Sequence, residues 1–398
     1  MTPPSQPNLA LDPQGIRGTS TARRMRQSRH RRQLRTLMFV LLIVAGAIVL
    51  GWLSLRPRAE GFTVAKGRTL PLDLGAPATL DGNGNLWQTS ASGALWRVDA
   101  NGQSQRYGVA TSAGAPPFVG AGGGIYLPGL DGTLTAFAAP GKAQWTRDLG
   151  AALATTPALW RAGDTAILAI GDSGGRVAGL NASDGKTLWS AQLGGPIGNG
   201  LTETRDGFVA PTLASGVWRG GLVSLGGQTG QIKWRFPPDR KMAAGVATPL
   251  FDADSNRVYW NNDEGLVASL DASSGRVIWQ TEVAPADAPM PVMLRARPVL
   301  FGQSLIVGGN DGILRSLDAG NGKALWKLEL KAPIRALHAA NFGGRPAVLA
   351  VDEREIVLVD ARTGAIIERD RGAMAWPIND GKGAIVVGDN GSWRRVKW

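Results

Sequence analysis

The feature that most constrains this chain is a repeat of about 45 residues that ends in tryptophan. Each of five copies has a glycine, a short apolar run, a second glycine and then a tryptophan four positions later. The five tryptophans lie 44, 45, 45 and 47 residues apart, at Trp145, Trp189, Trp234, Trp279 and Trp326. A fixed period of this length indicates an array of equivalent units, each of which buries its apolar face against its neighbours.

The residues within each unit indicate strands. Short runs such as Val-Ala-Ser-Leu and Leu-Arg-Ser-Leu are separated by Asp-Gly, Asn-Gly or Ser-Gly turns, and no stretch beyond residue 60 has sustained helical periodicity. Glycine accounts for 55 of 398 residues, about twice the ordinary share of ~7%, as many tight turns require. We therefore predict an all-β fold in which each unit is a four-stranded antiparallel blade of a β-propeller.

Weaker copies of the repeat raise the predicted number of blades to eight. They lie at residues 93–99, 355–360 (followed by Glu368 in the tryptophan position) and 391–397. The last copy ends after its third strand, and residues 67–74 align with the missing fourth strand. We therefore predict a propeller over residues 60–398 whose eighth blade is closed by both ends of the domain, which would hide two open strand edges.

The repeat tryptophans are predicted to lie on the outer strands and to pack between neighbouring blades. A ring of identical packing contacts accounts for their spacing without any ligand. The alternative is a set of aromatic platforms on which a ligand stacks.

A membrane segment is predicted before the propeller. Residues 37–55 contain no charged residue, and nineteen residues at ~1.5 Å each span about 28 Å, close to the ~30 Å hydrocarbon core. Residues 1–36 carry eight arginines against Asp12 alone. We therefore predict a disordered basic cytoplasmic tail (1–36) near anionic lipid head groups, and a single transmembrane helix (37–55) that acts as a signal anchor.

This topology places the propeller on the periplasmic or extracellular side of the inner (cytoplasmic) membrane. A cleaved signal peptide is the alternative, but residues 56–60 (Arg-Pro-Arg-Ala-Glu) make a poor cleavage site.

Charge and cysteine content exclude several kinds of site. The net charge is +12, of which the tail supplies 8 − 1 = +7, so the rest of the chain carries only +5 and no nucleic-acid partner is expected. The chain has no cysteine, which removes disulfides, thiolate metal sites and a lipid-accepting cysteine.

Two motifs resemble functional sites. Residues 171–175 (Gly-Asp-Ser-Gly-Gly) match the loop around the nucleophile of chymotrypsin-like proteases, which also need a histidine and an aspartate earlier in the domain. The chain's two histidines are His30, in the tail, and His338, downstream of the motif, so a propeller turn is the preferred interpretation. His338 itself is expected to be a core or rim residue of an Ala/Leu-rich strand.

The second motif resembles a calcium loop and comprises Asp252, Asp254, Asn256 and Asp263. Arg257 replaces its central glycine, and Asp263 replaces the usual final glutamate, so a hairpin turn is preferred. No convergent acid pair is visible. We predict no catalytic, cofactor-binding or metal-binding residue, and no enzyme activity.

The repeat Gly-x-Leu-x-x-Leu-Asp-x-x-x-Gly-x-x-x-Trp resembles the PQQ-type, quinoprotein-like propeller repeat over residues 60–398. In the dehydrogenase branch, the resemblance implies PQQ and calcium in an axial funnel beside a vicinal cysteine pair, which this chain lacks. The BamB branch comprises non-catalytic periplasmic scaffolds of outer-membrane β-barrel assembly. The chain resembles it in length, blade count and closing blade, but BamB is anchored through a lipidated N-terminal cysteine.

The resemblance to BamB implies a non-catalytic, membrane-anchored scaffold that binds another envelope protein, without cofactors and with an unidentified partner surface. Two alternatives remain. One is a ligand-binding or sensor propeller for a carbohydrate or a quinone; the other, favoured least, is a PQQ-dependent dehydrogenase.

Overall fold

Backbone contacts in the computed structural model divide the chain into residues 1–58 and 59–398. The structure describes residues 62–63, 69–70, 78–81, 83–89, 93–99, 103–109, 113–120, 122–140, 142–215, 220–237, 245–284, 290–352, 355–371, 374–377, 383–387 and 393–397. All of them belong to the second unit, and the secondary structure found there consists of strands.

Seven four-stranded antiparallel sheets follow one another along the chain, each with its strands in sequence order. We call them blades 1 to 7. Blades 1 to 4 are β3 (Ala78–Leu80), β4 (Leu86–Thr89), β5 (Ala94–Val98), β6 (Ser104–Val109); β7 (Phe118–Val119), β8 (Ile125–Pro128), β9 (Thr133–Ala139), β10 (Lys142–Asp148); β11 (Ala158–Ala162), β12 (Thr165–Gly171), β13 (Arg176–Asn181), β14 (Thr187–Gln192); β15 (Thr202–Thr204), β16 (Gly207–Thr212), β17 (Gly221–Gly226), β18 (Ile232–Phe236).

Blades 5 to 7 repeat this order. They are β19 (Leu250–Asp252), β20 (Arg257–Asn261), β21 (Leu266–Asp271), β22 (Val277–Glu282); β23 (Val299–Phe301), β24 (Ser304–Gly308), β25 (Ile313–Asp318), β26 (Ala324–Glu329); β27 (Ala336–Phe342), β28 (Arg345–Val351), β29 (Glu355–Asp360), β30 (Ile366–Arg371). The predicted four-stranded antiparallel blades are therefore confirmed for these seven units.

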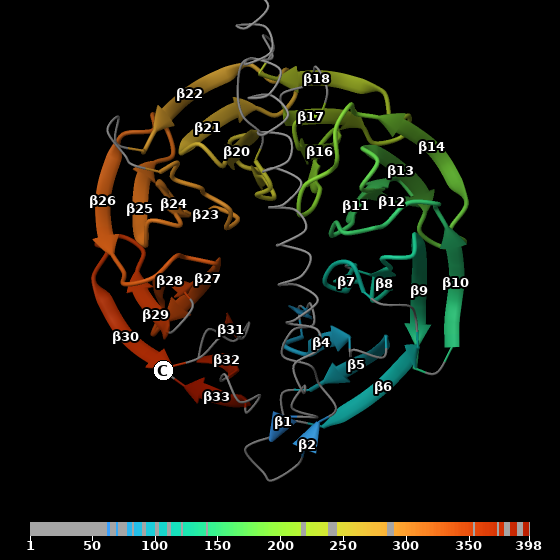
Figure 1. Cartoon of the computed structure of the whole chain (residues 1–398), viewed down its shortest axis with the longest axis horizontal. Coiled ribbons are helices and arrows are strands. Elements are labelled where there is room, and N and C mark those ends of the chain that lie inside the picture. Colours follow the sequence, from blue (N-terminus) through green and yellow to red (C-terminus); the bar gives the residue numbers. More distant parts are fainter. Residues whose placement is uncertain are drawn as a thin grey trace, which may run out of the picture. The chain divides into compact units, whose positions relative to one another are not determined.

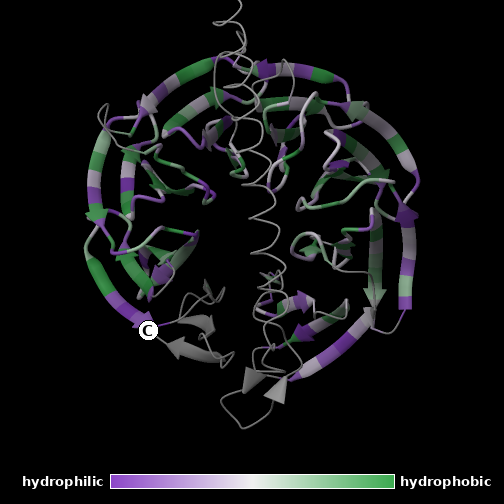
Figure 2. Cartoon of the chain, viewed as in Figure 1, coloured by the Kyte–Doolittle hydropathy of each residue, from purple (hydrophilic) through white to green (hydrophobic). Residues whose placement is uncertain are grey.

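The blades lie around a common centre, with the first strand of each blade innermost and the fourth at the circumference (Figure 1). Middle strands such as β12 and β13 are buried along most of their length, whereas burial alternates along outer strands such as β14 and β22. Hydrophobic residues accordingly continue through the middle strands and mix with polar ones on the circumference (Figure 2). This pattern is expected of sheets that pack face to face and leave their outer edge in water.

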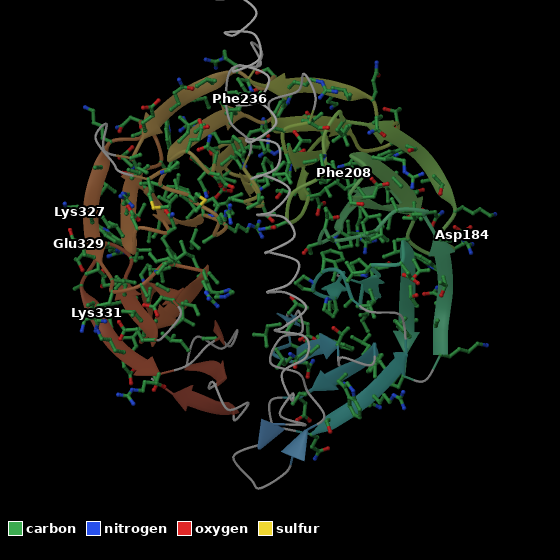
Figure 3. All side chains as sticks on the ribbon, viewed as in Figure 1. Asp184, Phe208, Phe236, Lys327, Glu329 and Lys331 are labelled. Carbon is green, nitrogen blue, oxygen red and sulfur yellow. The ribbon has the colours of Figure 1, made fainter. Side chains whose placement is uncertain are left out.

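Each blade places its connections on two opposite faces of the ring, because antiparallel strands reverse direction at every turn. We call one face the entry face: it carries the turn between the second and third strands and the connection that enters the next blade. Phe208 and Phe236 lie inside the blades, whereas Asp184, in a turn of the opposite face, and Lys327 lie at the circumference (Figure 3).

Two smaller sheets lie near the ends of the domain. β31 (Met374–Pro377), β32 (Gly383–Val387) and β33 (Trp393–Lys397) form a three-stranded sheet, as predicted for the last repeat. β1 (Phe62–Thr63) pairs with β2 (Thr69–Leu70), which lies within the segment predicted to complete the last blade. Residues 71–77 lie outside the described residues, so closure of an eighth blade by both ends stays a prediction.

In the part of the chain that the structure describes, no helix has the length and hydropathy needed to cross a membrane. The predicted tail (1–36) and membrane segment (37–55) both lie outside that part.

Candidate functional site

The innermost strands surround an axial channel with a cavity volume of about 700 Å³. It takes lining residues from blades 1 to 7 and mixes apolar with polar side chains. Its apolar side chains include Leu80, Phe118, Leu201, Phe251 and Leu337. Its charged or titratable ones are Glu203, Arg295, Arg297, Arg335 and His338. A cavity of this volume and mixed character is typical of binding sites for small organic molecules.

The channel wall is reinforced where the chain enters blades 3, 4 and 5. The amide of Thr156 donates to the carbonyl of Asn199 (2.8 Å), and the amide of Asn199 donates to the carbonyl of Val246 (2.9 Å). The hydroxyl of Thr202 donates to the carbonyl of Pro249 (2.5 Å). These bonds join neighbouring blades at their inner edges, so this part of the wall is held as one piece.

Three arginines face the channel from the two connections that enter blades 6 and 7. Arg295 donates through Nε (3.2 Å) and Nη2 (3.1 Å) to the same carboxylate oxygen of Asp263. Arg297 is exposed to the channel, and no hydrogen bond or ion pair of its guanidinium is found among the described residues. The protein atoms around its guanidinium displace part of the surrounding water, and this desolvation lowers the pKa of Arg297 even though the side chain is open to the channel.

Two other titratable groups of the channel also respond to burial. His338 on β27 has its pKa lowered to about 4 by burial, so it is uncharged at neutral pH. Burial raises the pKa of Glu203 on β15, and the charge of Arg161 partly opposes that shift. Among the described residues that line the channel, arginines outnumber carboxylates, and they lie on the connections that enter blades 6 and 7.

The channel residues do not fit a metal-bound quinone. Calcium takes six to eight oxygen ligands, mostly from carboxylates and carbonyls, and Glu203 is the one carboxylate among the described residues that line the channel. No group of three or more His, Cys, Asp or Glu side chains suited to a metal occurs in the described residues. The arrangement favours binding through guanidinium groups and apolar contact.

The five repeat tryptophans lie on the fourth strands, between neighbouring blades. Each indole Nε1 donates to a backbone carbonyl of the next blade, at distances of 2.8–3.2 Å. The pairs are Trp145 with Ala182, Trp189 with Gly227, Trp234 with Ala272, Trp279 with Ala319, and Trp326 with Ala361. We call each such contact a seam lock. None of the five tryptophans is among the residues that line the channel.

The second glycine of the repeat completes each seam lock. Gly275 has a φ of 70°, which favours glycine. A Cβ atom added to it would lie 2.6 Å from the ring of Trp234, so the indole packs directly on the turn of the next blade. The other locks show the same approach, at 2.3–2.7 Å, for Gly185, Gly230, Gly322 and Gly364. In the spacing Asp-x-x-x-Gly-x-x-x-Trp, the glycine therefore packs against the tryptophan of the previous blade. The tryptophan packs against the glycine of the next blade.

A bulge sets the orientation of these tryptophans. In blade 3, Trp189 pairs with Gly179 and Thr187 pairs with Leu180, which leaves Leu188 without a partner in the ladder. The same shift occurs between the third and fourth strands of blades 4, 5, 6 and 7. An extra residue on one strand changes which face the following side chain occupies, which accounts for the alignment of the indoles along the seams.

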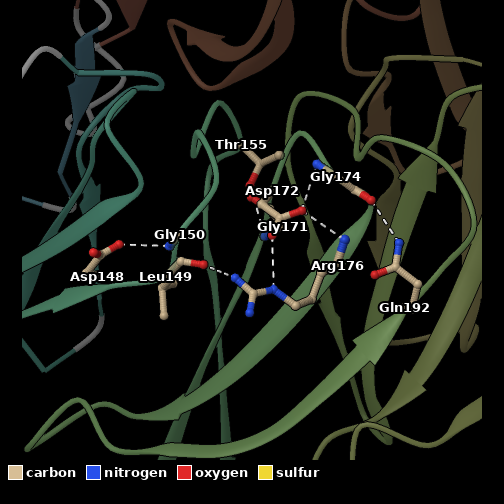
Figure 4. Close-up of polar contacts among 9 residues, drawn as sticks. All are labelled: Asp148, Leu149, Gly150, Thr155, Gly171, Asp172, Gly174, Arg176 and Gln192. Carbon is tan, nitrogen blue, oxygen red and sulfur yellow. Dashed lines mark hydrogen bonds and ion pairs between the residues drawn. The ribbon is translucent and has the colours of Figure 1, made fainter.

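The Gly-Asp-Ser-Gly-Gly motif forms the turn between β12 and β13 on the entry face (Figure 4). Asp172 is buried, and its Oδ1 accepts hydrogen bonds from the amides of Gly174 and Arg176, both at 2.9 Å. Its Oδ2 accepts from Nε of Arg176 (3.1 Å), whose Nη2 donates to the carbonyl of Leu149 in the previous connection. This carboxylate therefore holds a turn together.

The residues of the calcium-like motif do not come together in the structure. Asp252 accepts a hydrogen bond from the amide of Asp254 (3.2 Å) and another from the hydroxyl of Ser255, within the hairpin between β19 and β20. Asp263 lies beyond the other end of β20, where it pairs with Arg295. The strand between them prevents these carboxylates from converging on one ion.

The channel arginines were not identified from the sequence, although a signal exists. Thr156 precedes Pro157, and Thr248 precedes Pro249, at the start of the first strands of blades 3 and 5. Arg297 precedes Pro298 at the corresponding place in blade 6. Aligning the repeats on this proline would have revealed a charged residue in a position that faces the axis.

The family described as outer membrane protein assembly factor BamB matches residues 54–219 and 174–394. A curated relative, outer membrane protein assembly factor BamB of Burkholderia pseudomallei, is 29% identical over 201 residues, which are 47% of this chain and 50% of the relative. The chain spans about half the length of the curated relatives it matches.

Solved structures share the fold. BamB from Moraxella catarrhalis superposes with a TM-score of 0.61 at 16% identity, covering 81% of this chain and 96% of that one. Quinohemoprotein alcohol dehydrogenase from Comamonas testosteroni superposes with a TM-score of 0.60 at 13% identity, covering 83% of this chain and 71% of that one. A BamB protein and an alcohol dehydrogenase thus have similar backbones, so the fold alone does not indicate the function.

Proposed function

The chain belongs to the family of outer membrane protein assembly factor BamB, and on that premise we propose that it is a non-catalytic scaffold that binds another envelope protein during outer-membrane protein assembly. The observation that carries the proposal is the family match, which extends over residues 54–394 and therefore over nearly the whole propeller. The resemblance of the repeat to the same family agrees with it.

The geometry suits a binding platform. The seam locks join blades 2 to 7 through equivalent contacts, so the loops of these six blades project from a rigid arc. A rigid surface loses little conformational freedom when a partner binds, which favours affinity. A stable protein interface needs about 800 Å² from each partner, and adjacent blades can supply that area through their connecting turns.

The proposed arrangement in the cell follows from the N-terminal sequence. Residues 37–55 would anchor the protein in the inner membrane, the arginine-rich residues 1–36 would remain in the cytoplasm, and the propeller would lie outside it. Protease added to spheroplasts should then degrade residues 60–398 and leave the tail protected. A propeller that resists the protease until the membrane is broken would contradict this orientation.

Site-specific photo-crosslinking in native membranes tests the scaffold function. Leu130 is 52% exposed in an entry-face turn, and Asp184 lies in an exposed turn of the opposite face. A photoreactive residue at one of these positions should crosslink to an outer-membrane β-barrel protein or to a protein that assembles one, and the other position is the matched control. The proposal is wrong if neither face, sampled over all blades, gives such a crosslink.

A dehydrogenase is distinguished by its cofactor. Purified protein supplied with PQQ and calcium should show no alcohol- or sugar-dependent dye reduction, because the described channel residues include one carboxylate and no cluster suited to a metal. Saturable reduction that requires both cofactors would contradict the non-catalytic proposal.

A further inference from the structure

The seam between blades 2 and 3 contains a pocket of about 500 Å³ on the face opposite the entry face. Four glycines of the turn between β7 and β8 line it from blade 2. Blade 3 contributes residues of the turn between β11 and β12 and of the turn between β13 and β14. Among the described residues, Leu159 is the one that borders both this pocket and the axial channel, so the two cavities are distinct.

Two other seams are filled on this face by large side chains. Between blades 3 and 4, Nε1 of Trp160 donates to the carbonyl of Arg205 (3.1 Å), and a Cβ atom added to Gly227 would lie 2.3 Å from its ring. Between blades 5 and 6, Nη1 of Arg257 donates to the carbonyl of Ala319 (3.0 Å). In both seams, a side chain from the first hairpin of one blade closes the space beside the turns of the next.

Blade 2 has glycine at both of these positions. In blade 5, Arg257 precedes Tyr259 by two residues, and in blade 2 Gly124 precedes Tyr126 by two. The two tyrosine hydroxyls donate to equivalent carbonyls of the next blade. Gly120 lies opposite Gly124, to whose carbonyl its amide donates (2.9 Å), so it takes the place of the tryptophan in blade 3. With no side chain at either position, the seam between blades 2 and 3 stays open as a pocket.

The hairpin between β11 and β12 brings two charged side chains of opposite sign to this pocket. Arg161 and Asp164 both line it and are exposed. A Cβ atom added to Gly122 would lie 3.2 Å from Nη2 of Arg161, so the guanidinium lies beside the glycine turn of blade 2. No hydrogen bond or ion pair of either side chain is found among the described residues. The pocket therefore offers both guanidinium donors and carboxylate acceptors to a ligand.

The inner wall of the pocket is apolar. The ring of Tyr126 and the side chain of Leu159 are buried there, and a Cβ atom added to Gly120 would lie 3.6 Å from the first and 3.0 Å from the second. Sugar rings combine hydroxyls, each of which both donates and accepts, with C–H groups that pack on apolar surface. Opposite charges on one hairpin favour a ligand without net charge, and the volume is in the range of small-molecule sites.

We propose that this pocket binds a neutral sugar, with its hydroxyls bonded to Arg161 and Asp164 and one face of the ring packed against Tyr126 and Leu159. The site lies away from the axial channel and requires no metal. It is independent of the proposed scaffold function, since a propeller that binds no sugar could still bind an envelope protein.

An oligosaccharide array tests the kind of ligand. The full-length protein, kept in a detergent without a sugar head group, is applied to an array of neutral and acidic oligosaccharides, and calorimetry follows with the neutral sugar that binds best. We expect one molecule bound per chain. The proposal is overturned if no neutral sugar binds, or if acidic sugars alone bind.

An added arginine tests the place of binding. Gly124→Arg gives blade 2 the side chain that fills the seam between blades 5 and 6, and it should weaken sugar binding by at least about tenfold. The φ of Gly124 is not positive, so the backbone accepts a side chain, and the hydroxyl of Tyr126, 2.9 Å from the added Cβ, has to shift. Leu188→Arg is the matched control, because it adds the same side chain at a 47% exposed position on the circumference of blade 3 and should leave binding unchanged.

Two truncations test the hydrogen-bonding groups without adding bulk. Arg161→Ala should weaken binding by about tenfold, because it removes charged donors, and Asp164→Ala several-fold. Thermal unfolding of each variant checks that it is folded. Binding by folded Gly124→Arg or by folded Arg161→Ala that equals binding by the unaltered protein would overturn the proposal.

Discussion

The seams from blade 2 to blade 7 differ from those that surround the ends of the domain. In the first region, every seam has a tryptophan that donates to a carbonyl of the next blade and packs on its glycine. In the second, Arg106 occupies the corresponding position of blade 1 and Glu368 that of blade 7. Both side chains are exposed. The ring is thus built from a locked arc and a closing region held by other contacts.

The difference shows what the repeat stabilises. A propeller blade cannot bury its apolar face alone, so its stability depends on the seams as much as on its own ladder. A buried indole contributes area, a hydrogen bond and a fixed orientation at each seam. Where it is missing, the same blade must be held by packing between β strands, and we expect that region to open first.

The largest effect is expected from breaking the closing region itself. Deletion of residues 389–398 would remove β33, and deletion of residues 60–74 would remove the segment predicted to complete the same blade. Each deletion should cost several kcal/mol, a large part of an ordinary total stability of ~5–15 kcal/mol. Thermal unfolding and aggregation measure the loss.

Combining the two deletions tests whether both segments belong to one blade. If both segments belong to one blade, the double deletion should be little worse than either single one, because the effects are coupled. Additive losses, or a deletion of 60–74 that leaves the melting temperature unchanged, would show that this segment does not complete the blade.

Tryptophan removal compares the two regions directly. Trp234→Ala should lower the free energy of unfolding by about 3–5 kcal/mol, because it empties a buried seam and leaves the carbonyl of Ala272 without the indole N–H. Glu368→Ala, at the same repeat position in blade 7, should change it by less than about 0.5 kcal/mol, because that side chain is exposed. Denaturant unfolding of both variants measures the difference. Equal effects would remove the distinction between the regions.

Two glycine variants distinguish the effect of packing in a seam lock from the effect of backbone strain. Gly275→Ala introduces a side chain at a φ of 70° and within 2.6 Å of Trp234. Gly302→Ala introduces the same methyl group at a φ of 55° where no atom lies within 4 Å. Both should lose about 1 kcal/mol through strain, and Gly275→Ala about 1–3 kcal/mol more through the collision. Similar losses in denaturant unfolding would mean that the lock has room for a methyl group.

His338 gives the smallest predicted effect, and it depends on pH. Its pKa is lowered from 6.5 to about 4 in the folded protein, so the unfolded chain binds more protons between these values. Its contribution to stability is therefore complete above about pH 6.5 and lost as the pH falls toward 4. Because the side chain is partly open to the channel, we expect a loss of about 1–2 kcal/mol.

The matched variant His338→Gln should remove this part of the acid sensitivity. The measurement is unfolding stability from pH 7 to pH 4.5 for both proteins. Parallel pH profiles would show that His338 does not titrate differently in the folded state.

The repeat made the blade architecture predictable, because one physical requirement recurs every 45 residues. Trp145 to Trp326, the Asp-x-x-x-Gly turns and the third strands all follow from it. The axial site was not predictable in this way, because Arg297 and Arg335 face the channel through the placement of two connections and share no motif. The membrane segment stays a prediction from residues 37–55 alone.

Hydrogen exchange followed by mass spectrometry tests the central structural claim, a locked arc closed by a weaker region. Native-state exchange reports how readily each blade opens. We predict the slowest exchange in the middle strands of blades 3 to 6, such as β12 and β21, and distinctly faster exchange in β5, β32 and β33. Uniform protection around the ring, or slower exchange in β32 and β33 than in β21, would contradict the account.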